Sequence, residues 1–369
     1  MALTITDIRR APKALLHDHL DGGLRPETIL QLADECGWTP HLPSTDPVAL
    51  AAWFTRGAQT KDLLQYLATF EHTNAVMQTE AGLERVAFEA AMDLAADGVV
   101  YAEIRYAPEL HTNAGLALDA VVDAVQAGFA RGMVTAAAAG TPISVNTIIC
   151  AMRTEQRSVE IVRLTLRARQ SYPRVVAFDL AGAETGWSPL LHAEALAIAR
   201  AHQLHLTIHA SEPPDVELIA DALTCGAQRI GHGVRLTADI NADTGVLGPV
   251  ARFVLESQTT LELAPTCNVQ IGAVAQLADH PIDQFRQLGM RVTVNTDNRL
   301  MSDVSVSGEI LACADAFGWG WAEVEQVTLN ALESSFGSWS ERRRLVDDVV
   351  KPAYAVLSRS DPGVHLTFS

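Results

Sequence analysis

Residues 13–22 read Lys-Ala-Leu-Leu-His-Asp-His-Leu-Asp-Gly and join an apolar, strand-like run to two histidines, His17 and His19. Side chains alternate along an extended strand, so these two imidazoles point to the same side of it. Imidazole is a good ligand for zinc and for neighbouring transition metals. The pair alone is weak evidence, because closely spaced histidines also occur where no metal binds. Whether the pair belongs to a metal site depends on whether other parts of the chain supply the missing ligands.

Strand-like runs of this kind recur along the sequence. After residue 95, short apolar, β-branched runs alternate with longer, alanine-rich amphipathic runs. We expect strands over 14–20, 99–107, 144–152, 174–181, 204–209, 228–231, 260–265 and 291–295. Helices are expected over 118–139, 154–171, 189–201, 216–225, 248–257 and 282–288. Apolar strands separated by helices are typical of a parallel sheet buried on both faces. Eight such units predict an α/β fold, the TIM-type (β/α)8 barrel.

The first connection is much longer than a barrel requires. Residues 24–95 separate the first two strands, and their apolar spacing predicts several helices, including 50–54 and 63–73. This helical insertion leaves the C-terminal end of the first strand, so we expect it over the active-site mouth. It is either a lid with apolar walls or added bulk. Residues 302–369 are expected to add helices that cap the barrel, which makes 1–369 a single domain.

Composition limits the possible partners. Of the 369 residues 48% are hydrophobic and 19% charged, which allows a large core. A net charge of −17 without a basic cluster argues against nucleic acid polymers, although a single nucleoside stays possible. Five scattered cysteines without a Cys-x-x-Cys pair are typical of reduced thiols in the cytoplasm. The N-terminus lacks a signal-peptide run and the apolar stretch 132–152 is interrupted, so no membrane span is expected.

Polar side chains cluster at the ends of the expected strands. In a TIM barrel, residues at the C-terminal ends of the strands converge on one site. Four of these residues, one carboxylate and three imidazoles, would form an open metal site typical of catalytic zinc: His17, His19, His209 and Asp297. Zinc can lower the pKa of water from about 15.7 to about 7. Glu212 and His232 then remain for handling protons.

Each of these residues also has a structural alternative. Asp297 could cap the helix that follows the last strand, and His232 could simply hydrogen-bond a neighbouring loop. Three other histidines are expected on helix surfaces or in loops: His192, His202 and His280. The coincidence of so many polar residues at expected strand ends nevertheless favours a metal hydrolase.

Six segments, in order and spread over residues 16–298, make the chain resemble the adenosine deaminase family of the amidohydrolase superfamily. They are Leu16-His-Asp-His-Leu-Asp-Gly22, Asp179-Leu-Ala-Gly182, His209-Ala-Ser-Glu212, Gly231-His-Gly233, Pro265-Thr-Cys-Asn268 and Asn295-Thr-Asp-Asn298. None of them is decisive alone, but together they are specific.

The resemblance implies hydrolytic deamination of adenosine, with 2′-deoxyadenosine also accepted. Hydroxide activated by one zinc ion per chain attacks purine C6, and inosine and ammonia are released from adenosine. The implied metal ligands are the four residues named above. The implied catalytic residues are Glu212, which protonates N1, His232, which orients the hydroxide, and Asp297. The implied substrate contacts are His19, Asp21 at the ribose 5′-hydroxyl, Gly182 at N3 and Asn298 at N7.

Four positions depart from the family's usual pattern. Ser211 stands where the family usually has glycine, and Ala183 replaces an aspartate. Cys267 replaces a serine in a segment that also begins with alanine in place of cysteine. Asn298 replaces the second member of an Asp-Asp pair, and its amide can still donate a hydrogen bond to a purine nitrogen. The expected ligands and acid are unaffected, so the metal chemistry is better defined than the substrate.

Other interpretations remain open. The same mechanism could serve adenine or a 5′-modified adenine nucleoside such as aminofutalosine. A hydrolase of phosphoesters or lactones would often use two metals bridged by a carboxylated lysine, and no expected strand end carries a suitable lysine. A purine-binding protein without catalysis is the non-enzymatic alternative. The expected partner is a small purine nucleoside, and the oligomeric state is not predicted.

Overall fold

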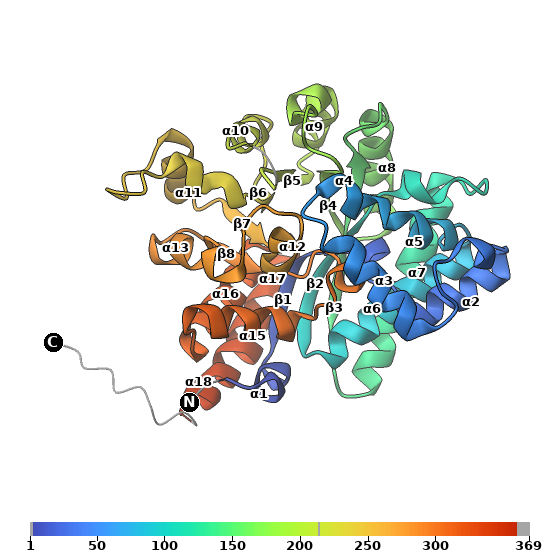
Figure 1. Cartoon of the computed structure of the whole chain (residues 1–369), viewed down its shortest axis with the longest axis horizontal. Coiled ribbons are helices and arrows are strands. Elements are labelled where there is room, and N and C mark those ends of the chain that lie inside the picture. Colours follow the sequence, from blue (N-terminus) through green and yellow to red (C-terminus); the bar gives the residue numbers. More distant parts are fainter. Residues whose placement is uncertain (1–2, 213–214, 360–369) are drawn as a thin grey trace.

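The computed structural model describes residues 3–212 and 215–359 and contains one parallel sheet with strands in chain order. The strands are β1 Lys13–His19, β2 Val99–Tyr106, β3 Ser144–Met152, β4 Val175–Ala181, β5 His205–Ala210, β6 Arg229–His232, β7 Thr260–Leu263 and β8 Val292–Val294. The end of β1 also pairs with the segment after β8, through a parallel bridge between Asp18 and Asp297. The sheet thereby closes into the expected (β/α)8 barrel (Figure 1).

All eight expected strands are present, with ends displaced by at most two residues. The helices between them are α7 Leu118–Ala138, α8 Ser158–Ser171, α9 Ala193–Ala201, α10 Glu217–Thr224, α11 Pro249–Ser257, α12 Pro265–Gln270 and α13 Ile282–Gln287. The helix expected over 189–201 is shorter, because a 3₁₀ turn, Pro189–His192, precedes α9. Strand β4 is buried along its whole length, as its continuous apolar sequence predicts.

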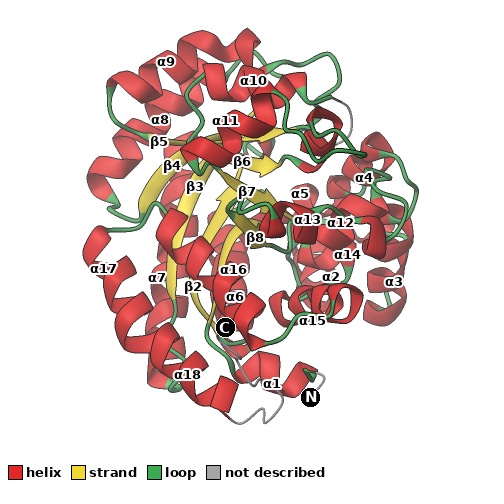
Figure 2. Cartoon of the chain, turned by 90° about the vertical axis from the view of Figure 1, so that its left-hand side faces the viewer, coloured by secondary structure: helices red, strands yellow, loops and turns green. Residues whose placement is uncertain are grey.

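The insertion after β1 is helical. It contains α2 Pro26–Cys36, α3 Pro47–Ala58, α4 Leu63–Ala68, α5 Phe70–Val76 and α6 Glu80–Ala96. The helix expected over 63–73 is divided at Thr69, whose hydroxyl donates to the Tyr66 carbonyl at 2.7 Å. Figure 2 shows α2 to α5 on the side toward which the strand arrows point. The two alternatives for this insertion, a lid and added bulk, stay predictions.

Further helices cover the barrel at both ends of the chain. They are α1 Ile5–Arg10, α14 Arg299–Ser302, α15 Val306–Phe317, α16 Trp321–Ser334, α17 Trp339–Arg344 and α18 Lys351–Arg359. Tyr354 of α18 is buried and donates a hydrogen bond to the Pro12 carbonyl at 3.2 Å, just before β1. The last ten residues of the expected C-terminal helices lie outside the described residues. None of the helices in 3–212 and 215–359 has the length and apolar character of a membrane span.

The barrel interior holds charged side chains that are almost completely buried. The Arg105 guanidinium lies 2.6 Å from Glu262, and Arg229 lies 2.6 Å from both Glu262 and Glu103. Buried charges require partners, because an unpaired ion is very costly to remove from water. Each buried arginine of these strands accordingly contacts carboxylates that belong to other strands. The network continues to the functional site.

Candidate active site

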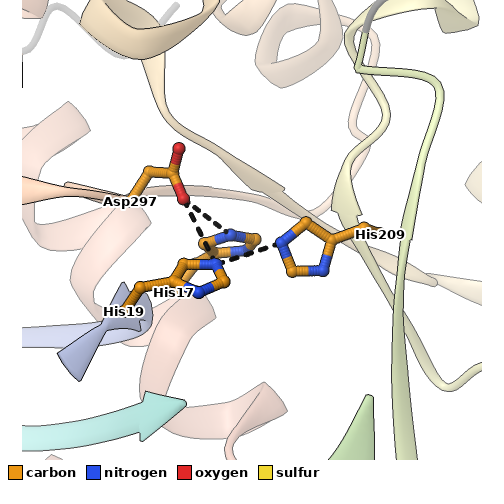
Figure 3. Close-up of side chains that lie close together, drawn as sticks. All are labelled: His17, His19, His209 and Asp297. Carbon is orange, nitrogen blue, oxygen red and sulfur yellow. Dashed lines mark hydrogen bonds and ion pairs between the residues drawn. The ribbon is translucent and has the colours of Figure 1, made fainter. Parts of the chain in front are cut away.

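Four side chains from distant parts of the sequence converge at the C-terminal ends of the strands (Figure 3). The Nε2 atoms of His17 and His19 lie 3.3 and 3.4 Å from Oδ1 of Asp297. The Nε2 atoms of His19 and His209 are 3.2 Å apart. One possible ligand atom from each of the four residues lies within 4.8 Å of all the others. The structure thus brings together the four residues that the sequence placed at the expected strand ends.

The cluster is suited to a metal ion. His17 Nδ1 faces the Glu262 carboxylate, which accepts its proton in a hydrogen bond, so a neutral His17 ring has its free lone pair on the buried Nε2. Three imidazole nitrogens and one carboxylate oxygen form a donor set that zinc and related divalent metals accept. The residues present thus fit a metal of this class.

Two buried carboxylates face the Nδ1 atoms of His17 and His209. Glu262 Oε2 lies 2.9 Å from Nδ1 of His17, and Asp179 Oδ2 lies 2.9 Å from Nδ1 of His209. Arg105 joins the carboxylates, at 2.6 Å from Glu262 Oε2 and 2.7 Å from Asp179 Oδ2. Such partners fix the ring orientation and leave Nε2 for the metal. Burial opposes ionisation of Asp179, but His209 and Arg105 hold its pKa below the ordinary range.

Glu262 and Arg105 were not predicted as site residues from the sequence, and Asp179 was given no role there. The sequence did contain an indication of their importance, because each of these three residues is an ionisable side chain within a mostly apolar strand. Such residues are rarely buried without a partner, so they mark positions that face a charge inside the barrel.

The strand ends share an uncommon backbone conformation. Gly182 after β4 has φ +95°, and Ser211, His232 and Asp297 have φ between 56° and 62°. Left-handed backbone in residues other than glycine costs about 1–3 kcal/mol and is concentrated at functional sites. The alternative role of Asp297 as a helix cap does not apply, because Asn298 occupies the cap position of α14 and makes no side-chain cap.

A cavity of about 260 Å³ opens beside the cluster. It brings together every residue expected to bind substrate or handle protons: His19, Asp21, Gly182, Glu212, His232, Asp297 and Asn298. Helices α4 and α5 of the insertion contribute an apolar wall: Leu63, Tyr66, Leu67 and Phe70. An apolar pocket with a few convergent polar groups is typical of a small-molecule site.

Glu212 is buried beside two other carboxylates. Burial raises its pKa well above the ordinary value, and repulsion from Asp297 and Glu184 adds to the effect. The Glu212 backbone N–H points to the Glu184 carboxylate, with N–O distances of 3.3 and 3.5 Å. His232 Nε2 lies 3.5 Å from Glu212 Oε1. The environment therefore favours the protonated, hydrogen-bond-donating form of the Glu212 side chain.

Asp21 also lines the pocket, and burial raises its pKa to about 7, with repulsion from Asp297 and Asp18 adding to the effect. Asp21 Oδ1 and Asn298 Oδ1 are buried and have no hydrogen-bond partner among the described residues. Asn298 also approaches the backbone so closely that a Cβ on Gly22 would lie 2.1 Å from its Oδ1. Only glycine fits at that position.

The departures from the family pattern have local explanations. Ser211 adopts a left-handed conformation, which accounts for the usual glycine, and its hydroxyl donates to the Asp215 carbonyl. The Cys267 thiol donates to Asp297 Oδ2 at 2.8 Å, while Asp297 Oδ1 faces the histidines. Cys267 was not selected as a site residue from the sequence. Its position inside a family segment was the available signal.

The expectation for His192 was wrong, because this residue is buried at the end of the 3₁₀ turn Pro189–His192 rather than exposed on a helix surface. His280 lies in a loop, as expected, and is buried there. His192 contacts the Ser158 hydroxyl and the Arg153 carbonyl, at 2.9 and 3.0 Å. Burial of a neutral imidazole is affordable when both of its nitrogens are hydrogen-bonded.

Comparison with known proteins agrees with this site. The model of a family described as adenosine deaminase matches residues 12–352. Adenosine deaminase from Mycobacteroides abscessus is 51% identical over 359 residues, which cover 96% of this chain and 98% of that protein. The Mycolicibacterium vanbaalenii protein of the same name is 50% identical with the same coverage. The crystal structure of adenine deaminase from Arthrobacter aurescens superposes with a TM-score of 0.80 at 27% identity, covering 92% of this chain and 98% of that one.

Proposed function

The chain belongs to the adenosine deaminase family, and from this premise we propose that it hydrolyses adenosine to inosine and ammonia, accepting 2′-deoxyadenosine as well. The observation that carries the proposal is the meeting of a three-histidine, one-aspartate cluster with the buried Glu212 carboxyl in one pocket. Replacement of an amino group by oxygen at an aromatic carbon needs a nucleophile for that carbon and a proton donor for the ring nitrogen bonded to it.

We propose one zinc ion per chain, held by His17, His19, His209 and Asp297. Bound there, zinc would supply hydroxide at neutral pH by lowering the pKa of water from about 15.7 to about 7. Support comes from the open donor set and from the two carboxylates that orient His17 and His209. Unlike a cysteine-rich structural site, this set of nitrogen and oxygen ligands would allow zinc to take water as a fifth ligand.

Glu212 is the proposed acid. Oxygen addition at C6 places electron density on N1, which must accept a proton as the adduct forms. The Glu212 carboxyl can donate that proton because burial favours its neutral form. His232 would orient the incoming oxygen, and Asp297 would accept a hydrogen bond from it. The proton of the added hydroxyl would pass, through Asp297, to the amino nitrogen. Cleavage of the C6–N bond then releases ammonia and leaves a C6 carbonyl beside the N1–H, and the purine ring regains its conjugation.

The other polar groups are proposed to hold the nucleoside. The Gly182 N–H would donate to N3, the Asn298 amide to N7, and Asp21, with His19 nearby, would bind the 5′-hydroxyl. No lysine or arginine of the described chain lines the cavity, so a 5′-phosphate would lack a counter-charge next to Asp21. This supports a nucleoside rather than a nucleotide. The unpaired cysteines support a reducing compartment, and we propose the cytoplasm.

Adenine is the second candidate substrate, because the Arthrobacter aurescens relative in structure is named adenine deaminase. The deciding experiment is ammonia release from adenosine, adenine and aminofutalosine, with protein of measured zinc content. Rapid turnover of adenosine with little of the other two supports the proposal. Turnover of adenine or aminofutalosine alone would contradict the assigned substrate but keep the deaminase chemistry. Tight adenosine binding without ammonia release would indicate a non-catalytic purine-binding protein.

A further inference from the structure

A line of hydrogen bonds approaches His232 from the side away from Glu212. The Nδ1 atom of His232 lies 3.2 Å from the amide nitrogen of Asn268, which belongs to α12. The amide oxygen of Asn268 lies 3.2 Å from Nε2 of His280, and Nδ1 of His280 lies 3.2 Å from the backbone nitrogen of Ile282. Asn268 is completely buried and His280 is 3% exposed.

The direction of every bond in this line follows from its last member. The Ile282 backbone N–H can only donate, so Nδ1 of His280 must accept and carry no proton. A neutral His280 then carries its proton on Nε2 and donates to Asn268 Oδ1. Burial supports the neutral ring, because it lowers the pKa of His280 to about 3. This leaves the Asn268 NH2 group facing His232, whose Nδ1 must in turn accept.

We propose that Asn268 and His280 are positioning residues that hold His232 in the tautomer protonated on Nε2. His232 then presents an N–H donor to the pocket, 3.5 Å from Glu212 Oε1, rather than a lone pair. The inference deepens the proposed function, on which it rests. In that reaction His232 stabilises the oxygen that adds to C6 by donating a hydrogen bond, and does not remove a proton from it.

The tautomer can be observed directly. In zinc-loaded protein labelled with ¹⁵N-histidine, the two ring nitrogens of His232 are assigned by comparison with His232→Gln, and their ¹⁵N shifts and N–H couplings distinguish protonated from unprotonated nitrogen. We expect Nδ1 to be unprotonated and Nε2 protonated. A protonated Nδ1 with a bare Nε2 would overturn the proposal. This measurement requires no variant to fold other than the one used for assignment.

A pair of substitutions tests the line itself. In His280→Gln, the amide oxygen can accept from Ile282 and the amide nitrogen can donate to Asn268, so the direction is kept. In His280→Leu, both bonds are lost and the Asn268 amide is free to turn. We expect His280→Leu to lower kcat about 10- to 100-fold with little change in KM or zinc content, and His280→Gln to restore most of the loss.

His192→Gln is the matched control, because His192 is another buried histidine with polar contacts at both ring nitrogens, outside the pocket. It should retain the His232 tautomer and kcat. Equal kcat in wild type and His280→Leu, with an unchanged His232 tautomer, would contradict the proposal. If wild-type protein has the expected tautomer but releases no ammonia from adenosine, the proposed substrate fails while the hydrogen-bond line stands.

Discussion

The Glu262 carboxylate lies 2.9 Å from Nδ1 of His17, on the side of the ring away from the nitrogen that faces Asp297. Asp179 has the same relation to His209, and Arg105 connects the two carboxylates. His17 is thus oriented before any metal arrives, because its Nδ1 is hydrogen-bonded to Glu262, and the Asp179 carboxylate lies close enough to Nδ1 of His209 to form an ion pair. We therefore expect metal affinity to depend on carboxylates that would not touch the metal.

Asp179→Asn tests that dependence. The amide keeps the shape of the side chain but removes the charge that faces His209 and Arg105, so the zinc dissociation constant should rise about 10- to 100-fold. Competition with a chromogenic chelator measures the constant. His209→Ala should lose both zinc and activity, while Asp119→Asn on the surface should change neither. Unaltered zinc affinity in Asp179→Asn would show that the carboxylate does not support His209.

Glu212→Gln separates metal binding from proton donation. Gln keeps the volume of the side chain but cannot act as an acid, so zinc content should be unchanged while kcat for adenosine falls about 10²- to 10⁴-fold. Steady-state ammonia release and metal analysis of the same preparation give both quantities. Glu194→Gln, on an exposed position of α9, is the control for loss of a carboxylate. Near-normal turnover in Glu212→Gln would remove this residue from the mechanism.

The strands and their ends were predictable because each rests on a local pattern. Continuous apolar runs mark buried parallel strands, and in a barrel this places His17, His209 and Asp297 at one face without further information. The division of 63–73 into α4 and α5 was not predictable, since no glycine or proline interrupts that stretch. At the division the Thr69 hydroxyl donates to the Tyr66 carbonyl, an interaction that the sequence pattern does not indicate.

Interactions between strands could not be read from the sequence. Glu262 meets His17, Arg105 and Arg229, which lie on three other strands, and nothing in the order of residues fixes these pairings. The role of Asn268 was hidden for the same reason. The sequence placed it in a family segment, whereas its two partners, His232 and His280, are defined only by the packing of α12 against the strand ends.

Ser211 provides a test of backbone strain. Its φ of 60° costs a residue with a Cβ about 1–2 kcal/mol, which Ser211→Gly would relieve. Greater freedom of the unfolded chain and the lost bond to Asp215 offset this gain, so we expect the free energy of unfolding to change by less than about 1 kcal/mol. Ser211→Val should destabilise by about 2 kcal/mol or more, because branching at Cβ strains this conformation and adds bulk to a buried position. Denaturant unfolding compares the variants. Equal stability of the valine and glycine variants would refute the strain.

Glu309 of α15 gives the protein a dependence of stability on pH. Burial raises its pKa to about 7, although hydrogen bonds from Thr266 oppose the change. Because the folded state holds this proton more tightly than the unfolded state, stability from Glu309 is complete below about pH 4.5 and is lost as the pH rises to about 7. Glu309→Gln stays neutral throughout. Its free energy of unfolding should match wild type near pH 4.5 and exceed it by up to about 3 kcal/mol above pH 7.

Urea unfolding of both proteins at several pH values between 4.5 and 8 measures that difference. Metal binding also varies with pH, but it affects wild type and Glu309→Gln alike, so the comparison isolates the carboxyl group. Glu256→Gln, exposed on α11, should follow the wild-type curve at every pH. A constant difference between Glu309→Gln and wild type would mean that the Glu309 carboxyl does not titrate in this range. Ionisation of the buried Glu309 carboxyl would then not explain the pH dependence of the free energy of unfolding.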